Sequence, residues 1–264
     1  EIGSGLVGSE MGIRDRFTVD HVPLQLDDHL RRFYRSAKKI DIDIPMPFEE
    51  LRAMVLDFCR RIDSPDAMAY VQATRGVGMR GHAYRFAGGT PSLWVWVKPD
   101  MLDPMDRSYK AITMEDTRYF HCDIKTINLL PAVIYTQRAE EAGCDETILH
   151  RGDRVTECAH SNVHILKDGA LKTAPCDNLI LPGITRAHRI AQCREMGIPV
   201  IEEPFTVREM MEADEVFFTS ASALCCRIEE IDGQKVGGRA PELIARIQKA
   251  AWDEALAEVR QING

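Results

Sequence analysis

Residues 120–131 read FHCDIKTINLLP and place Lys125 among mostly apolar neighbours, just before a helix-like segment. A lysine is seldom fully buried without a partner, so its amine needs an explanation. One interpretation is a side chain at a strand end whose amine reaches water. The other is an amine desolvated by its surroundings, because desolvation lowers the pKa and leaves a nucleophile that forms a Schiff base with a carbonyl.

Three possible metal ligands, His121, Cys122 and Asp123, directly precede this lysine. On a β-strand, successive side chains point to opposite faces, so His121 and Asp123 would face one side and Cys122 the other. No second pair of ligands elsewhere in the sequence has a familiar spacing. We therefore expect no metal site at this segment.

The composition excludes several classes of protein. Hydrophobic residues make up 45% and charged residues 28% of the 264 residues, which is typical of a soluble globular protein with a real core. The net charge of −8, without a block of like charge, argues against nucleic acid or a membrane as the main partner. Eight cysteines without framework spacing, and no signal peptide or long apolar run, predict reduced thiols and a cytoplasmic location.

The first part of the chain predicts a helix followed by strands. PFEELRAMVLDFCRR, residues 47–61, has apolar residues at helical spacing after an initial proline. AMAYVQATRG (67–76) and SLWVWVKP (92–99) are typical of strands because of their aromatic and β-branched residues and their Gly and Pro boundaries. Since VKPDMLDPMDRSYK has two prolines, three aspartates and no apolar period, we predict a linker at residues 99–110.

Beyond the linker, ETILHRGDRVTE, SNVHILKDGALKTA and DEVFFTSAS are rich in strand-forming residues. A helix is expected between Gly183 and Gly197, and PELIARIQKAAWDEALAEVRQI predicts another at the C-terminus. These patterns indicate an α/β protein with a small domain at 1–98 and a larger one at 111–264. A cleft between two domains is a common place for a small-molecule site.

Three further motifs each have a functional and an ordinary interpretation. Glu157, between two strand-like segments, is either an exposed edge carboxylate or the acidic partner of a pyridine nitrogen. In LPGITRA (181–187), a glycine turn opens a helix whose first amides could bind a phosphate or simply form an N-terminal cap. TSAS (219–222) could donate hydrogen bonds to the same phosphate or be a plain turn. A lysine, a carboxylate and an anion-binding helix start are what pyridoxal phosphate (PLP) requires, although their spacing alone does not name it.

The order of these motifs resembles a known family. RYFHCDIKTINLL, ILHRGDRVTECAHSNVHILKDG, LILPGITRAHRIA and DEVFFTSAS resemble the large domain of class IV (fold type IV) PLP-dependent aminotransferases. LDDHLRRFYRSAKKI and VQATRGVGMRGH resemble the small domain, and the match is greatest with bacterial D-amino-acid aminotransferases. The resemblance runs from about residue 24 to 240. It implies fold type IV, with a small N-terminal α/β domain, a larger C-terminal α/β pseudo-barrel domain, and a homodimer with the site near its interface.

The resemblance also assigns roles at the cofactor. Lys125 would hold PLP as a Schiff base and move the proton between the substrate Cα and the cofactor C4′. Glu157 would bond the pyridine nitrogen, and Arg32 would bind the phosphate. The remaining cofactor contacts that it implies are Leu181, Ile184, Thr185, Ser220, Ala221 and Ser222.

At the substrate, Arg80 and His82 match the family's Arg-x-His pair, which traps the α-carboxylate and marks the D-specific branch. The N-terminal part departs from the family's FGDGVYE segment, whose tyrosine also bonds that carboxylate. A gap-free alignment places Ile13 at the tyrosine position and Arg14 at the following acidic position. Two explanations remain open: Arg14 could be a substitute donor, or the start of the small domain could be shortened or divergent.

The resemblance implies transamination between a D-amino acid, such as D-alanine, and a 2-oxo acid, such as 2-oxoglutarate or pyruvate. The alternatives are a branched-chain L-aminotransferase and a lyase of the aminodeoxychorismate type, and Arg80 and His82 argue against both. An alternative of another class is a PLP-binding protein with little or no catalysis, which would follow from the divergent N-terminus.

Overall fold

The computed structural model describes residues 11–78, 82–84 and 89–264. The chain forms two compact units. The first comprises the described residues up to Met101 together with Ile124–Asn128 and Ala257–Gly264, and the second comprises Leu102–Asp123 and Leu129–Leu256. The domain limits expected from the sequence, 1–98 and 111–264 with a linker at 99–110, stay a prediction.

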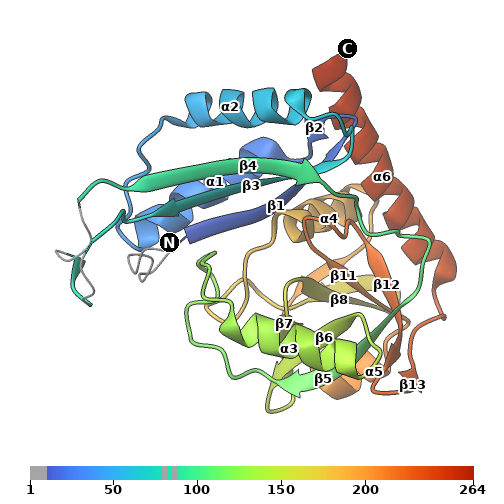
Figure 1. Ribbon diagram of the computed structural model, residues 1–264. Helices are drawn as coiled ribbons and strands as arrows, with labels where there is room; N and C mark the ends of the chain where they lie inside the picture. The colour runs from blue at the N-terminus through green and yellow to red at the C-terminus, as the bar shows by residue number, and fades with distance from the viewer. Residues whose placement is uncertain (1–10, 79–81, 85–88) are drawn as a thin grey trace. The chain divides into compact units, whose positions relative to one another are not determined.

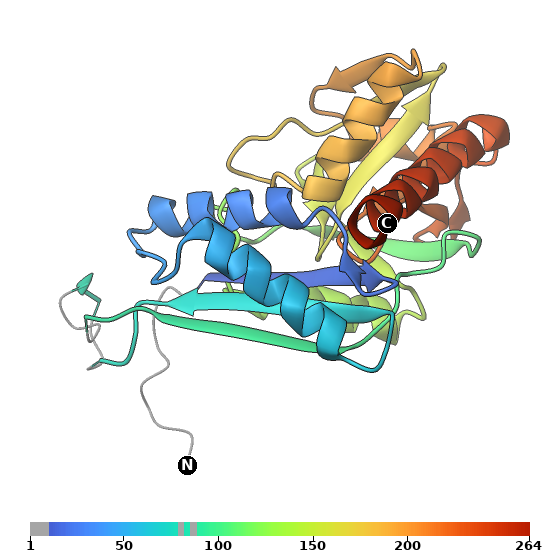
Figure 2. The same ribbon diagram turned by 90° about the horizontal axis from the view of Figure 1, so that it is seen from above.

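The first unit is a four-stranded sheet with two helices on one of its faces (Figure 1 and Figure 2). The strands lie in the order β2-β1-β3-β4, and every neighbouring pair is antiparallel. The core between helices and sheet contains Leu30 and Phe33, Leu51 and Val55, and Val71. The elements of this unit are β1 (Met11–Val19), β2 (Val22–Pro23), α1 (Leu26–Lys39), α2 (Phe48–Arg61), β3 (Ala67–Thr74) and β4 (Ser92–Pro99).

The sequence explains why α1 and α2 form here. In α1, acidic residues occupy the first turn and basic residues the last, which complements the helix dipole. The same distribution occurs in α2, which follows Pro47 as its N-terminal cap residue. The predicted helix at 47–61 is confirmed at Phe48–Arg61, and the predicted strands are confirmed as β3 and β4.

The second face of the small sheet carries aromatic side chains. Along β4, Leu93, Val95 and Val97 pack against the helices, while Trp94 and Trp96 alternate with them and are exposed. The ring of Trp96 stacks on Tyr70 of β3, with 4.9 Å between the ring centroids. This face therefore differs in character from the aliphatic face under the helices.

The second unit contains a nine-stranded mixed sheet. Eight strands follow the order β10-β9-β8-β11-β12-β5-β6-β7, and β13 pairs with β12. The strands are β5 (Tyr109–Glu115), β6 (Glu146–Arg151), β7 (Arg154–Cys158), β8 (Asn162–Lys167), β9 (Ala170–Thr173), β10 (Val200–Glu202), β11 (Glu215–Thr219), β12 (Cys226–Ile231) and β13 (Gln234–Lys235). The helices are α3 (Leu130–Glu141), α4 (Ile184–Glu195), α5 (Val207–Met211) and α6 (Pro241–Asn263), the last turns of which belong to the first unit.

A large apolar core supports this sheet. Ile148, Val155, Ile165, Val216 and Ile228 are all completely buried in one cluster. Burying an aliphatic side chain of this size stabilises the folded state by roughly 1.5–3 kcal/mol. The core can therefore offset the cost of burying several polar groups nearby. The strand-rich segments and both helices predicted beyond the linker are confirmed.

The prediction of a strand around His121–Asp123 is wrong. These residues form a turn rather than a strand. The Cys122 amide donates to Asn178 O, and the Cys122 thiol donates to Tyr119 O. Because the chain turns here, strand alternation does not decide where these side chains point.

No helix within the described ranges is both long and apolar enough to cross a membrane. Likewise, the described side chains contain no group of three or more His, Cys, Asp or Glu placed to hold a metal ion. All eight cysteines are free thiols.

Candidate active site

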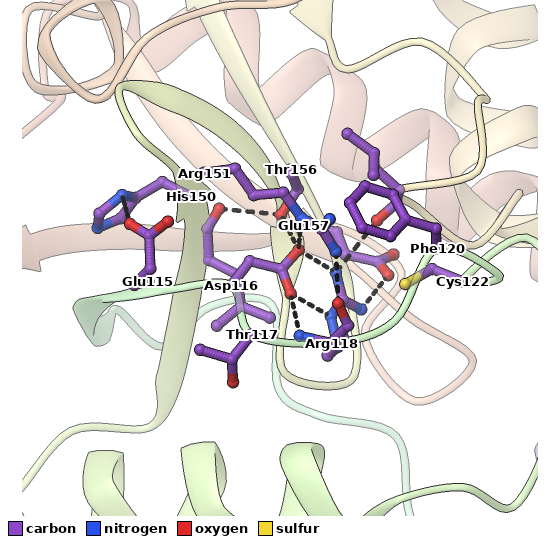
Figure 3. Close-up of polar contacts among 12 residues, drawn as sticks. Glu115, Asp116, Thr117, Arg118, Phe120, Cys122, His150, Arg151, Thr156 and Glu157 are labelled. Carbon is purple, nitrogen blue, oxygen red and sulfur yellow. Dashed lines mark hydrogen bonds and ion pairs between the residues drawn. The ribbon is translucent and has the colours of Figure 1, made fainter.

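A buried ion-pair network lies where β5 ends. Asp116 follows the last residue of β5, and both of its carboxylate oxygens are held by the Arg118 side chain, each at 2.9 Å (Figure 3). The Thr156 hydroxyl and Arg151 Nε also donate to Oδ2 of Asp116, at 3.0 and 3.2 Å. Asp116 is thus fixed by residues from β6 and β7 as well as by its own segment.

Glu157 on β7 lies on the other side of Arg118 (Figure 3). Arg118 Nη1 donates to Oε1 of Glu157 at 2.5 Å. The other oxygen, Oε2, accepts from Asn162 Nδ2 at 2.9 Å and from the Leu181 amide at 3.0 Å. Three donors from separate segments therefore fix the orientation of this carboxylate.

Burial and charge act against each other on the two carboxyls. Burial raises the pKa of Glu157, although the charge and hydrogen bond of Arg118 and the Leu181 amide oppose that rise. Burial would also raise the pKa of Asp116, but the hydrogen bonds and charge of Arg118 outweigh it and hold that pKa below its usual value. Glu157 is consequently the more basic of the two groups.

The turn before α4 packs closely on this network. Asn162 Nδ2 also donates to Leu181 O at 3.0 Å, which ties the turn to β8. A Cβ atom at Gly183 would overlap the Asn162 side-chain oxygen, so glycine is required by close approach rather than by backbone conformation. Leu181, predicted as a cofactor contact, lies beside Glu157 through its amide.

Two predicted phosphate-binding segments also meet in the second unit. Ile184 and Thr185 are the first residues of α4, after the cap residue Gly183. The Thr185 hydroxyl donates to Ser220 O at 2.7 Å, which joins the helix start to the turn after β11. In that turn, the amides of Ser222 and Ala223 donate to the Ser220 hydroxyl, and the two serine hydroxyls lie 3.0 Å apart. Helix-start amides beside small hydroxyl residues suit an anionic group.

Lys125 and Arg32 belong to the first unit. Arg32 is buried on α1. Lys125 is half-buried, and its amide lies 3.5 Å from the Ser36 hydroxyl of the same helix. The pairing of these residues with Glu157 around one cofactor remains a prediction.

The predicted substrate residues are only partly described. His82 is exposed, and Arg80 lies outside the described residues. The backbone of Ile13 in β1 pairs with Val71 of β3, and the pairing shifts register between Ile13 and Arg16. The side chains of Ile13 and Arg14 lie outside the described part of the chain.

Sequence reasoning missed three residues that hold Glu157 in place, directly or through a neighbour: Arg118, Asp116 and Asn162. Asp116 and Arg118 are separated by one residue, so they point to the same side of an extended segment. That spacing was a usable signal, but it is common on protein surfaces. Only the fold brings the pair against Glu157.

The residues of the second unit fit a pyridine cofactor with a phosphate. Each carboxylate oxygen can accept two hydrogen bonds, and Oε1 of Glu157 accepts only from Arg118 among the described residues. One acceptor position on that atom is therefore available for a protonated ring nitrogen. The start of α4 and the Ser220–Ser222 turn supply donors of the kind that a phosphate needs.

The fold is shared with solved structures of aminotransferases. The chain superposes on a branched-chain amino acid aminotransferase from Escherichia coli with a TM-score of 0.83 and 25% identity, over 94% of this chain and 85% of that one. A branched-chain amino acid aminotransferase from T.th., solved with pyridoxamine 5'-phosphate, gives a TM-score of 0.82 at 22% identity, over 95% of this chain and 85% of that one. This similarity confirms the expected fold type IV architecture.

Comparison at the level of sequence defines the family. The model of the amino-transferase class IV family matches residues 13–231. A D-alanine aminotransferase from Bacillus licheniformis is 38% identical over 236 residues, which cover 88% of this chain and 83% of that protein. The chain belongs to the class IV aminotransferases, as its motifs predicted.

Proposed function

We propose that this protein is a PLP-dependent aminotransferase that exchanges amino and oxo groups between a D-amino acid, such as D-alanine, and a 2-oxo acid, such as 2-oxoglutarate or pyruvate. The observation that carries the proposal is the carboxylate of Glu157, fixed by three donors with one acceptor position left, in a chain whose relatives are D-alanine aminotransferases.

Bound PLP supplies an electron sink that stabilises the carbanion formed when the substrate Cα loses its proton. Lys125 would hold the cofactor covalently and afterwards carry that proton between the substrate Cα and the cofactor C4′. Glu157 would keep a proton on the ring nitrogen. A lysine suits proton transfer because desolvation can bring its pKa close to working pH.

The phosphate would be bound by Arg32, by the amides of Ile184 and Thr185, and by Ser222. The helix dipole of α4 favours an anion at its start. Leu181, Ser220 and Ala221 would complete the cofactor contacts, in agreement with the position of the Leu181 amide on Glu157.

Arg80 and His82 would bind the substrate α-carboxylate, because a guanidinium fork matches a carboxylate. With Ile13 at the position where the family has a tyrosine, Arg14 would be the additional donor. We further propose a cytoplasmic homodimer as the working form.

A branched-chain L-aminotransferase is the second candidate, favoured by the similarity to the branched-chain amino acid aminotransferase of Escherichia coli. Stereospecificity separates the two candidates. The purified protein, loaded with PLP, is mixed in separate samples with D-alanine, L-alanine and L-leucine while the visible absorption band is followed.

Loss of the band with D-alanine alone supports the proposal, and loss with L-leucine but not with D-alanine supports the second candidate. A band that none of the three amino acids changes would indicate a PLP-binding protein with little catalysis. A preparation given PLP that develops no visible band, and no borohydride-stable adduct at Lys125, would overturn the cofactor assignment.

A further inference from the structure

We propose that Arg118, oriented by Asp116, is a positioning residue that selects Oε1 of Glu157 as the atom that meets the cofactor ring. The inference rests on the proposed function, since it assumes that Glu157 faces a pyridine nitrogen. Two of its three residues, Arg118 and Asp116, were given no role by the sequence motifs. All three lie in the second unit (Figure 3).

The hydrogen bonds of Glu157 distinguish its two oxygens. Oε2 already accepts from Asn162 and from the Leu181 amide, so both of its acceptor positions are used. Oε1 accepts from Arg118 alone among the described residues. A ring N–H would therefore bond the same oxygen atom that Arg118 holds.

The orientation of Arg118 is itself fixed. Its Nε and Nη2 donate to the two oxygens of Asp116, and Nη2 also donates to Leu179 O at 3.1 Å. Only Nη1 is left for Glu157. Because Asp116 binds one edge of the planar guanidinium group, the N–H groups of Nη1 point in a fixed direction. A lysine ammonium on its flexible side chain would not be oriented in this way.

The charges alternate along the network. Arg151, Asp116, Arg118 and Glu157 follow one another with alternating sign, and the Asp116 side chain is completely buried. Without Arg118, Glu157 would be a buried carboxylate that keeps only neutral donors, Asn162 and the Leu181 amide. Such a group takes up a proton, and a protonated Glu157 no longer stabilises a protonated ring nitrogen.

The test uses Arg118→Met and Arg118→Lys in the full-length protein. A matched control is Arg189→Met, because Arg189 is a buried arginine of the same unit that pairs with Glu254 rather than Glu157. PLP affinity is measured by titration of the visible band, and kcat and KM for D-alanine are measured at saturating PLP.

A hydrogen bond to a charged group is worth about 1.5–3 kcal/mol, so Arg118→Met is expected to weaken PLP binding roughly 10- to 100-fold. Arg118→Lys should lose less, because it keeps the charge, and Arg189→Met should stay within about twofold of the unchanged protein. At saturating PLP, kcat should fall in Arg118→Met while KM for D-alanine stays the same, since no substrate contact is removed.

A double-mutant cycle with Glu157→Gln distinguishes a positioning role of Arg118 from a general structural role. If Arg118 acts through Glu157, Arg118→Met should have little further effect on PLP affinity in the Glu157→Gln background. An equal effect in both backgrounds, or an Arg118→Met protein that binds PLP within about twofold of normal, would overturn the inference.

Different results would refute the proposed function. Absence of a borohydride-stable adduct at Lys125 in the unchanged protein would refute the cofactor assignment itself. A protein that binds PLP but ignores D-alanine would refute the substrate assignment, and the affinity measurements would still test Arg118.

Discussion

Two arginines of the second unit, the largely buried Arg118 beside Glu157 and the completely buried Arg189 on α4, differ in how their donors are used. Every side-chain nitrogen of Arg118 donates to Asp116, Glu157 or Leu179 O. Arg189 is completely buried and donates through Nη2 to Glu254, whereas its Nε and Nη1 have no hydrogen-bond partner among the described residues.

Their pKa values differ accordingly. Burial would lower the pKa of Arg118, but Asp116 and Glu157 raise it well above the ordinary value. Burial lowers the pKa of Arg189, and Glu254 opposes this only in part. A largely buried charge in which every side-chain nitrogen donates therefore marks the proposed site, while the incompletely paired Arg189 lies farther along α4 and has no proposed role in binding or catalysis.

The largest effect is expected for Arg118→Met. The substitution leaves Glu157 without a cation and Asp116 with fewer donors, both in buried positions. Removing one partner of a buried pair costs about 3–5 kcal/mol, so the free energy of unfolding should fall by about that amount. Urea unfolding of the cofactor-free protein measures this free energy. A loss below about 1 kcal/mol would contradict the expected difference between Arg118 and Arg189.

The second-largest loss in the free energy of unfolding is expected for Asp116→Asn, and this loss should depend on pH. Because the pKa of Asp116 is held low, its ionised form contributes stability that is fully present above the ordinary pKa and is lost as pH falls. We expect a loss of about 1.5–3 kcal/mol near pH 7 that shrinks below about pH 4. Urea unfolding at several pH values checks this.

The matched control for that measurement is Asp57→Asn. Asp57 pairs with Arg61 on the exposed side of α2, where an ion pair is worth less than about 1 kcal/mol. A loss for Asp116→Asn that does not change with pH would show that its charge is not what matters.

Gly183→Ala should have a smaller effect, transmitted to Glu157 through Asn162. The new methyl group would overlap the Asn162 side-chain oxygen, and overpacking of this kind costs about 1–3 kcal/mol. Thermal unfolding measures the loss. In an Asn162→Ala background the substitution should cost nothing more, and an undiminished loss there would contradict the packing explanation.

The smallest effect is expected for Arg189→Met. Glu254 is partly exposed and keeps His188 at 2.6 Å, so the removal of Arg189 leaves no buried unpaired carboxylate. Two side-chain nitrogens without a hydrogen-bond partner, Nε and Nη1 of Arg189, disappear as well. The free energy of unfolding should change by less than about 1 kcal/mol, and a loss as large as that of Arg118→Met would erase the contrast between the two arginines.

Local patterns were sufficient for most elements of the fold. The apolar spacing and the terminal charges of 47–61 predict α2, and β-branched and aromatic runs predict β3, β4 and β11. The segment at His121–Asp123 shows where such patterns fail, because hydrogen bonds to distant residues such as Asn178 set its turn.

The site was predictable in part. Glu157, Ile184 and Thr185 lie in motifs that can be recognised, whereas the role of Arg118 depends on contacts across 39 positions of the sequence. The pairing of β5 with β6 and of β6 with β7 brings Asp116, Arg151 and Glu157 together. No local pattern encodes that register, so the ion-pair network appears only in the folded chain.

The most direct test of the central claim is to load the protein with PLP, reduce it with borohydride and map the modified peptide by mass spectrometry. We predict a single modified residue, Lys125, and loss of the adduct in Lys125→Ala. An adduct at another lysine, or equal labelling of Lys125→Ala, would contradict the assignment of this site.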